Sequence, residues 1–188
     1  MTTKHNKHPL VIRQFNRADA ALAAEFFAAN ARHFQPWEPL RASDYYQQEQ
    51  LQQRLLTYEQ QQQAGVAAYF IALQDQQLVA HCSLTQIVYG PFRAGYLGFG
   101  VAEQLQGKGV MTQLCRAVLD HAFDQLALHR VMANYMPHNQ RSAQLLAKLG
   151  FSVEGLARQY LQINGQWQDH VLTALLQSDY QRGRGQRG

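Results

Sequence analysis

The chain has 188 residues, 46% of them hydrophobic, which fits a single domain with an apolar core and excludes disorder over most of its length. Its apolar runs fall short of the roughly 20 residues that span a membrane, and its polar start, MTTKHNKHP, lacks the apolar segment of an export signal, so we expect a cytoplasmic protein with no membrane association. The net charge is +4, but five of the 17 basic residues (Lys4, Lys7, Arg182, Arg184 and Arg187) lie at the two ends, and the other 12 stand against 13 acidic residues, which argues against a DNA-binding surface on the folded part.

Cysteine and histidine usage predicts neither a disulfide framework nor a metal site. The two cysteines, Cys82 and Cys115, are too few for a disulfide scaffold, and we expect both to be reduced thiols in the core. The eight histidines occur without a CxxC or HExxH pattern, so we expect no bound metal.

Hydrophobic periodicity predicts a mixed α/β domain over residues 8–180. In chain order we expect a strand at 10–15, helices at 19–32 and 43–63, strands at 67–73, 78–89 and 92–101, a helix from 110, a strand at 130–135, a helix at 140–149, and strands at 153–163 and 167–175. The pattern ends at Gln177, and we expect residues 181–188 to be a flexible basic tail. There is no internal repeat and no linker, so one domain is predicted.

Caps and turns predict several of the boundaries. Ser43 is placed to N-cap the second helix, and Asn139 to N-cap the helix that ends at Gly150. Asn164-Gly165 is a type I′ hairpin signal between the last two strands. Two prolines frame Trp37 in the segment HFQPWEP, which should stop the first helix and cover the core or line a substrate groove.

The most informative stretch runs from the strand at 92–101 into the helix that follows it. Gln104-x-x-Gly107-x-Gly109 forms a glycine turn that opens directly onto the helix. Glycines allow positive φ and close approach of a ligand, and the first N–H groups of a helix have no internal partner. A strand, a glycine turn and a helix start together make an anion site. Thr112 stands where a dinucleotide fingerprint would have its third glycine, and the phosphate loop G-x-x-x-x-G-K-[ST] is absent.

The glycine turn resembles the pyrophosphate loop of the GCN5-related N-acetyltransferases, which hold acetyl-coenzyme A. Four segments, HFQPWEP, AGYLGFGVAEQLQGKGVM, HRVMANYMPHNQRSAQLLAKLGF and GQWQDHVLTAL, are similar to those of the Rim-type ribosomal-protein-alanine N-acetyltransferases, and they span most of residues 8–180. The chain departs from the family in its RGRGQRG tail, its glutamine-rich second helix, and Glu103, where acetyltransferases often carry proline.

This resemblance implies a fold, a cofactor and a set of contacts. The fold would be a mixed, mostly antiparallel sheet splayed between its fourth and fifth strands, with helices on both faces and the pantetheine arm in the splay. The residues implied to contact acetyl-coenzyme A are Phe99, Gly100, Val101, Gln104, Leu105, Gln106, Gly107, Lys108, Gly109, Val110, Met111, Asn139 and Ser142. An amine would attack the acetyl thioester directly in a ternary complex, while a backbone N–H polarises the acetyl carbonyl.

Catalytic side chains are harder to assign. By the family pattern N-x-x-S, Ser142 is the candidate donor to the departing thiolate, although a serine there can also bond its own helix end. Asn139 can contact the cofactor and cap its helix at once. Glu38, Glu154, Asp169 and His138 are all possible bases, and Glu38 joins Ser142 as the candidate catalytic pair.

The missing clear base favours an N-terminal amine as acceptor. An α-amine with a pKa of about 7.8 is roughly a quarter neutral at pH 7.4, whereas a lysine at about 10.4 is close to 0.1% neutral. The first hypothesis is therefore acetylation of the N-terminal residue, alanine by the resemblance, of a ribosomal protein. A small-amine acetyltransferase acting on a polyamine or aminoglycoside, and a non-catalytic ribosome-assembly factor that uses the arginine tail, are the alternatives. The oligomeric state stays open.

Overall fold

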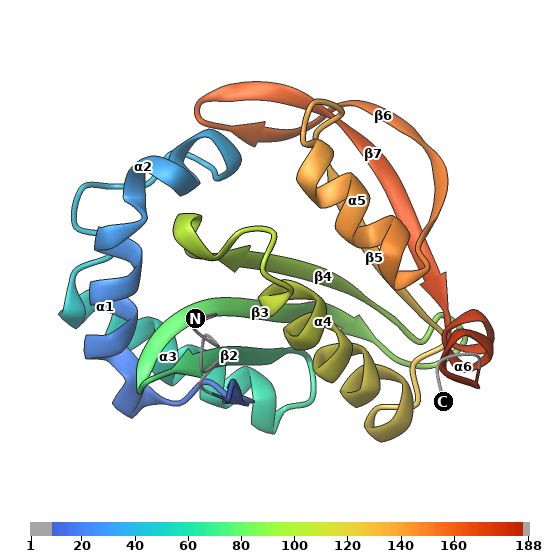
Figure 1. Ribbon diagram of the computed structural model, residues 1–188, viewed down its shortest axis with the longest axis horizontal. Coiled ribbons are helices and arrows are strands. Elements are labelled where there is room, and N and C mark those ends of the chain that lie inside the picture. Colours follow the sequence, from blue (N-terminus) through green and yellow to red (C-terminus); the bar gives the residue numbers. More distant parts are fainter. Residues whose placement is uncertain (1–8, 186–188) are drawn as a thin grey trace, which may run out of the picture.

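The computed structural model describes residues 9–185 as a seven-stranded sheet with helices on both faces (Figure 1). The strands are β1 (Val11–Gln14), β2 (Ala68–Gln74), β3 (Gln77–Val88), β4 (Ala94–Val101), β5 (Arg130–Tyr135), β6 (Ser152–Ile163) and β7 (Gln166–Leu176). Their order is β1-β2-β3-β4-β5-β7-β6, and every neighbouring pair is antiparallel except β4 and β5. The fold class and the order of elements predicted from the sequence are confirmed.

The helices divide between the two faces of the sheet. They are α1 (Ala20–Ala29), α2 (Ala31–Phe34), α3 (Gln48–Gln63), α4 (Val110–Asp120), α5 (Gln140–Leu149) and α6 (Gln177–Gly185), with a π-helical turn (His121–Gln125) that prolongs α4. Neighbouring residues of β2 show the division, because Ile71 packs with α1 and α3 whereas Ala72 packs with α4 and α5. Alternation along a strand sends successive side chains to opposite faces, so each face has its own core.

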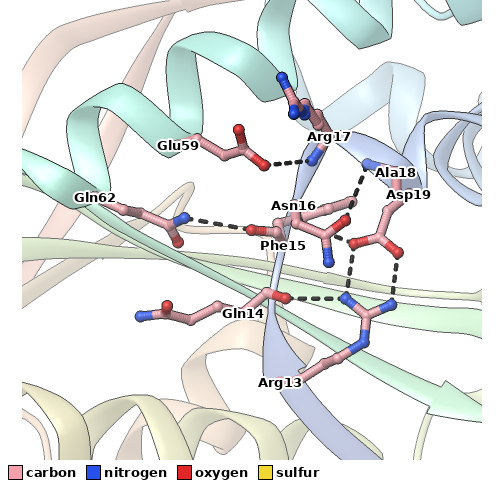
Figure 2. A network of polar contacts seen from close by, with 9 residues as sticks. All are labelled: Arg13, Gln14, Phe15, Asn16, Arg17, Ala18, Asp19, Glu59 and Gln62. Carbon is pink, nitrogen blue, oxygen red and sulfur yellow. Dashed lines mark hydrogen bonds and ion pairs between the residues drawn. The ribbon is translucent and has the colours of Figure 1, made fainter.

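A polar network fastens the start of α1 to the sheet and to α3 (Figure 2). Arg13 of β1 donates to both carboxylate oxygens of Asp19, at 2.7 and 2.5 Å, and Asp19 also accepts from the Asn16 N–H. The Arg17 N–H donates to Glu59 of α3 at 2.9 Å. Burial alone would raise the pKa of Asp19, but the hydrogen bonds from Arg13 and Asn16 outweigh it and hold this pKa below its ordinary value. The ion pair therefore fixes where α1 leaves the sheet.

Two predicted helix boundaries are wrong. The helix predicted from Ser43 begins only at Gln48, and the residues between form turns in which the Tyr45 N–H bonds the Ala42 carbonyl. The helix predicted at 19–32 is broken at Asn30, whose buried side chain turns back to donate to the Phe26 carbonyl. A buried amide that bonds the backbone competes with helix continuation, so the chain restarts as α2.

The prediction that regular structure ends at Gln177 is also wrong. The chain continues as α6, in which Tyr180 is 3% exposed and donates to Asp120 of α4 at 2.9 Å. Arg184 pairs with Asp120 and Asp124, at 3.2 and 2.7 Å. Of the predicted tail, 181–185 belong to this helix and 186–188 lie outside the described residues.

Other local predictions are confirmed. Asn139 caps α5 by accepting from the Ser142 N–H at 3.1 Å, and Gly150 ends that helix with φ 97°. Asn164 and Gly165 both have positive φ, as a type I′ turn requires. Cys82 and Cys115 are free and buried. No helix within residues 9–185 is long and apolar enough to cross a membrane.

Candidate active site

The glycine turn has the geometry of an anion site. Gly107 and Gly109 have φ of 71° and 84°, and a Cβ placed on either one would meet no atom within 4 Å. Gly109 is the N-cap of α4 and provides no side-chain cap, so the N–H groups of the first turn stay available to a ligand. The side chains of Val110 and Met111 are buried in the core, which leaves only their backbone for such a contact.

Neighbouring elements hold this turn in place. The buried Asn30 accepts from the Glu103 N–H at 3.0 Å, and this bond ties the end of α1 to the start of the turn. The side chain of Gln106 contacts the His33 ring of α2 at 3.1 Å and accepts from Arg141 of α5. Leu105 packs against both cores, whereas Gln104 and Lys108 are exposed. The turn is therefore bound to α1, α2 and α5 before any ligand arrives.

The predicted splay between the fourth and fifth strands is present. β4 and β5 pair only from Ala94 to Tyr96 and from Arg130 to Met132, and the strands then separate (Figure 1). Beyond this point β4 pairs with β3 alone and β5 with β7 alone. The inner edge of residues 98–101 therefore carries backbone groups without a strand partner, which suits β-augmentation by an extended amide ligand.

Two glycines leave one face of β4 without side chains beside the splay. Gly98 lies opposite Ser83 of β3 and Gly100 opposite His81, so each pair shares one face of the sheet. A Cβ at Gly100 would come within 2.5 Å of His81 Nε2, and one at Gly98 within 3.1 Å of Ser83 Oγ. The strand therefore presents bare backbone here, and the neighbouring side chains fill the space.

A small cavity lies on this face, between the sheet and the helices α1 and α3. Its volume is about 130 Å³. Its polar and aromatic lining comes from Phe15, Phe27, Glu38, Arg41, Tyr45, Tyr46, Arg54, Tyr58, Tyr69, Phe70, His81 and Ser83. His81 and Ser83 face Gly100 and Gly98 of β4. The cavity that they line therefore adjoins the part of β4 that lacks side chains on this face.

The predicted catalytic residue Glu38 lines this cavity. Its carboxylate accepts a hydrogen bond from Tyr46, whose ring stacks on Phe27 of α1 at 4.5 Å between centroids. Burial, and then the bond to Glu38, raise the pKa of Tyr46 far above its ordinary value, so Tyr46 remains a donor at neutral pH. The hydroxyl thus fixes the orientation of the carboxylate.

His81 lines the cavity within a cluster of aromatic rings. The rings of Phe26, Phe27 and Phe34 surround it at centroid distances of 6.0, 5.4 and 6.0 Å. Its Nε2 is buried and has no hydrogen-bond partner among the described residues. Burial lowers its pKa to about 4, so the imidazole is neutral at pH 7.

The other three possible bases do not line this cavity. Glu154 pairs with Arg130 at 2.6 Å, at the end where β4 and β5 are still joined. Asp169 accepts from the Gln159 N–H at 2.8 Å, across the β6–β7 hairpin. His138 packs against Trp37, with their ring centroids 5.6 Å apart, just before α5.

The candidate acid Ser142 lies in the first turn of α5 and is half-buried. Its N–H is held by Asn139, and its hydroxyl makes no hydrogen bond to any other residue of the described part of the chain. The alternative role, a hydroxyl that bonds its own helix end, is therefore not seen. Asn139 serves as the cap, as predicted.

Sequence reasoning missed several residues of this region. Asn30, Tyr46, His81 and Arg141 act through contacts with segments far away in sequence, and none belongs to a local motif. Only Asn30 left a signal, a lone amide within an alanine-rich helix. Among residues 9–185, no group of three or more His, Cys, Asp or Glu side chains is placed to hold a metal ion.

Comparison with known proteins gives this geometry a family. The model of the acetyltransferase (GNAT) domain matches residues 9–152. The chain is 40% identical over 177 residues to the [ribosomal protein uS5]-alanine N-acetyltransferase of Escherichia coli, covering 93% of this chain and 91% of that one.

Solved structures agree. The ribosomal-protein-S5-alanine acetyltransferase of Vibrio fischeri superposes with a TM-score of 0.87 at 35% identity, covering 96% of this chain and 97% of that one. RimJ of Mycobacterium smegmatis, solved with CoA-disulfide, gives a TM-score of 0.84 at 29% identity, covering 89% of this chain and 81% of that one. The chain belongs to the GNAT acetyltransferase family and is an acetyltransferase that uses acetyl-CoA as its acetyl donor.

Proposed function

We propose that this enzyme transfers the acetyl group of acetyl-CoA to the N-terminal α-amine of a ribosomal protein, with alanine as the acetylated residue. The observation that carries the proposal is the 40% identity, over 93% of the chain, to an enzyme that acetylates the alanine of a ribosomal protein. The cavity beside the open face of β4 supports it, because an amine there would lie next to the splay. An enzyme with this substrate would work in the cytoplasm, within the single domain predicted for residues 8–180.

The cofactor contacts follow from the two backbone features of the site. Gly107, Lys108, Gly109 and the N–H groups of Val110 and Met111 would hold the pyrophosphate at the start of α4. The unpaired edge of residues 99–101 would bond the pantetheine amides, and one N–H there would polarise the acetyl carbonyl. Gln104, Leu105 and Gln106 complete the turn, and Asn139 borders the other side of the splay.

Glu38 would receive the acceptor amine. Its carboxylate lines the cavity with its orientation set by Tyr46, and it can bind an ammonium group and then accept its proton. The demand on this base is small, because an α-amine with a pKa of about 7.8 is partly neutral near pH 7. The amine would attack the thioester directly while both substrates are bound.

Ser142 would stabilise the leaving thiolate. Its half-buried hydroxyl has no other partner within residues 9–185, so it is free to donate to the sulfur as charge develops there. Asn139 positions this serine by holding its N–H.

The described residues do not favour the two alternatives. A polyamine needs several carboxylates, and Glu38 is the only acidic residue that lines the cavity. A ribosome-assembly role would rest on the arginines of the tail, yet Arg182 pairs with Asp179, and Arg184 with Asp120 and Asp124. Arg187 lies outside the described residues.

Intact-mass spectrometry of ribosomal proteins tests the proposal. Cells with and without this gene should differ by one acetyl group on the N-terminus of a ribosomal protein. Complementation with the wild-type gene should restore it, and the Gly109→Glu variant should not. Purified enzyme should also acetylate an alanine-initiated peptide far faster than spermidine. The opposite ranking would transfer the assignment to a small-amine acetyltransferase.

A further inference from the structure

Two arginines lie together at the cavity without any role in the proposed chemistry. The Cζ atoms of Arg41 and Arg54 lie 4.4 and 3.5 Å from the centroid of the Tyr45 ring. Arg54 also donates to the Tyr45 carbonyl at 2.7 Å. Stacking on an aromatic ring leaves the edge of a guanidinium available to bind a planar anion.

Neither guanidinium is neutralised by a carboxylate of the described part of the chain. Within residues 9–185, no carboxylate lies within ion-pair distance of Arg41 or Arg54. Both side chains line the same cavity as Glu38, so this small space has two positive charges for one negative charge. Unpaired arginines grouped beside a substrate site are a common means of binding a carboxylate.

We propose that Arg41 and Arg54 form a subsite for an acidic side chain of the acceptor polypeptide, close behind its N-terminal residue. This inference rests on the proposed function, since it assumes that a peptide enters the cavity amine first. Glu38 would take the ammonium group and the arginines the carboxylate. Glu38, Arg41 and Arg54 line one cavity of about 130 Å³. The acidic residue of the peptide therefore lies a short distance from its N-terminus, at the second, third or fourth position.

The shape of the subsite favours a carboxylate over a nucleic acid. Arg41 and Arg54 line one small cavity together with Tyr45, Tyr46 and Tyr58, whereas RNA backbone binding uses a long basic groove. The same two charges would repel a polyamine, because its second ammonium group would approach them. The subsite therefore selects against one class of acceptor while it selects for another.

Calorimetry with the CoA-loaded protein tests the subsite separately from turnover. The ligands are alanine-initiated hexapeptides that carry either Asp or Lys at position two, three or four. At one position the Asp peptide should bind about tenfold more tightly than its Lys counterpart, as expected for a charge-assisted hydrogen bond. Arg41→Gln is the more specific variant, because Arg41 is exposed and makes no side-chain hydrogen bond within residues 9–185, whereas Arg54 also supports Tyr45. Arg41→Gln and Arg54→Gln should each lose most of the preference for the Asp peptide.

The matched control is Arg93→Gln. Arg93 is exposed and precedes Ala94, where β4 is still paired with β5. It should keep the full preference. Acetylation of both peptides without any preference would overturn the subsite and leave the proposed function standing. A preference in binding without acetylation would support the subsite and overturn the proposed function, and absence of binding to either peptide would overturn both. Loss of affinity for a short RNA in the Arg variants, with the peptide preference intact, would replace the subsite by an RNA contact.

Discussion

The backbone carbonyl of Glu38 accepts a hydrogen bond from the N–H of Asn164 at 2.8 Å. This bond joins the loop after α2 to the tip of the β6–β7 hairpin, across the mouth of the splay (Figure 1). Leu40 lies against the hairpin tip at the same junction. Its Cδ1 is so near Gly165 that a Cβ at that position would be 2.9 Å away. The position of the proposed base therefore depends on a hairpin more than 120 residues further along the chain.

Gly165→Ala should weaken this junction. The position has φ 79°, which strains an alanine, and its methyl group would displace the end of the Leu40 side chain, so we expect a loss of stability of about 1 kcal/mol. We also expect a higher KM for the peptide and an unchanged affinity for CoA. Gly155→Ala on β6 is the control, because its Cβ would meet no atom within 4 Å and its φ is not positive. Peptide kinetics and calorimetry measure both effects, and equal KM values in the two variants would contradict the junction.

Gly109→Glu should abolish CoA binding, because it places a negative charge where the pyrophosphate is proposed to lie. Gly109→Lys imposes the same positive-φ strain with the opposite charge, so it separates strain from electrostatics. We expect calorimetry to find CoA affinity in the lysine variant and none in the glutamate variant. Unchanged affinity in a folded Gly109→Glu protein would refute the assignment of this turn.

Ser142→Ala should lower turnover by about 10- to 150-fold, the value of roughly 1.5–3 kcal/mol for one donor to a charged group. The loss should appear in kcat with little change in CoA affinity, because the hydroxyl acts only in the transition state. Ser152→Ala, an exposed serine at the start of β6, is the control. Full turnover in Ser142→Ala would leave this residue as a part of the helix start only.

Stability should fall between pH 6.5 and pH 4 because of His81. Its pKa in the folded protein is about 4, so the unfolded chain takes up the proton first as the pH drops below its ordinary value of 6.5. The contribution of His81 to the free energy of unfolding is therefore fully present above pH 6.5, and about 2 kcal/mol of it is lost between pH 7 and pH 5. Asp19, whose pKa is lowered, adds a further loss only below its ordinary value of 3.8.

Urea unfolding of the wild type and of His81→Asn at pH 7 and pH 5 measures the His81 contribution. The variant should lose less stability over this interval, by about 2 kcal/mol. His121, whose pKa burial also lowers, is present in both proteins and cancels in the comparison. Parallel pH profiles for the two proteins would show that His81 is already protonated or hydrated in the native state.

Deletion after Gln181 should leave peptide turnover within about twofold, because the exposed ion pairs of Arg182 and Arg184 contribute little. Tyr180→Ala should behave differently, since it removes a buried ring that contacts Phe123 and Asp120. We expect that variant to lose roughly 3–5 kcal/mol of stability. Thermal unfolding and a peptide assay distinguish the two changes, and a large loss of turnover on deletion would bring the end of α6 into the catalytic site.

The sequence predicts the glycine turn, the Asn139 cap and the Asn164-Gly165 hairpin well because each depends on neighbouring residues alone. A positive φ or a side chain that bonds an N–H three residues ahead is a local requirement. The helix start at Gln48 was missed because Ser43, a good cap by type, lies in a chain of turns. α6 was missed because a basic, glycine-containing segment has poor helix propensity, and what holds it is the buried Tyr180, which bonds Asp120 of α4.

The candidate site likewise has one part that a local motif predicts and one part that depends on contacts between distant segments. Most of the proposed cofactor contacts lie in one continuous stretch, from Phe99 to Met111, so a motif can indicate them. The lining of the cavity includes Glu38 from a loop, His81 from β3 and Arg54 from α3, and only the folded chain shows that they meet. Four possible bases could not be ranked from the sequence because the ranking depends on which of them already has a partner, as Glu154 has in Arg130.

Gly98 and Gly100 of β4 offer unequal routes by which substrate scope could change. An alanine at position 98 would approach only the hydroxyl of Ser83, which can rotate away, so this position can evolve or be engineered. An alanine at position 100 would meet the His81 ring at 2.5 Å, and that ring is packed against three phenylalanines. Diversity among acceptors should therefore arise at the first glycine, while the second remains fixed.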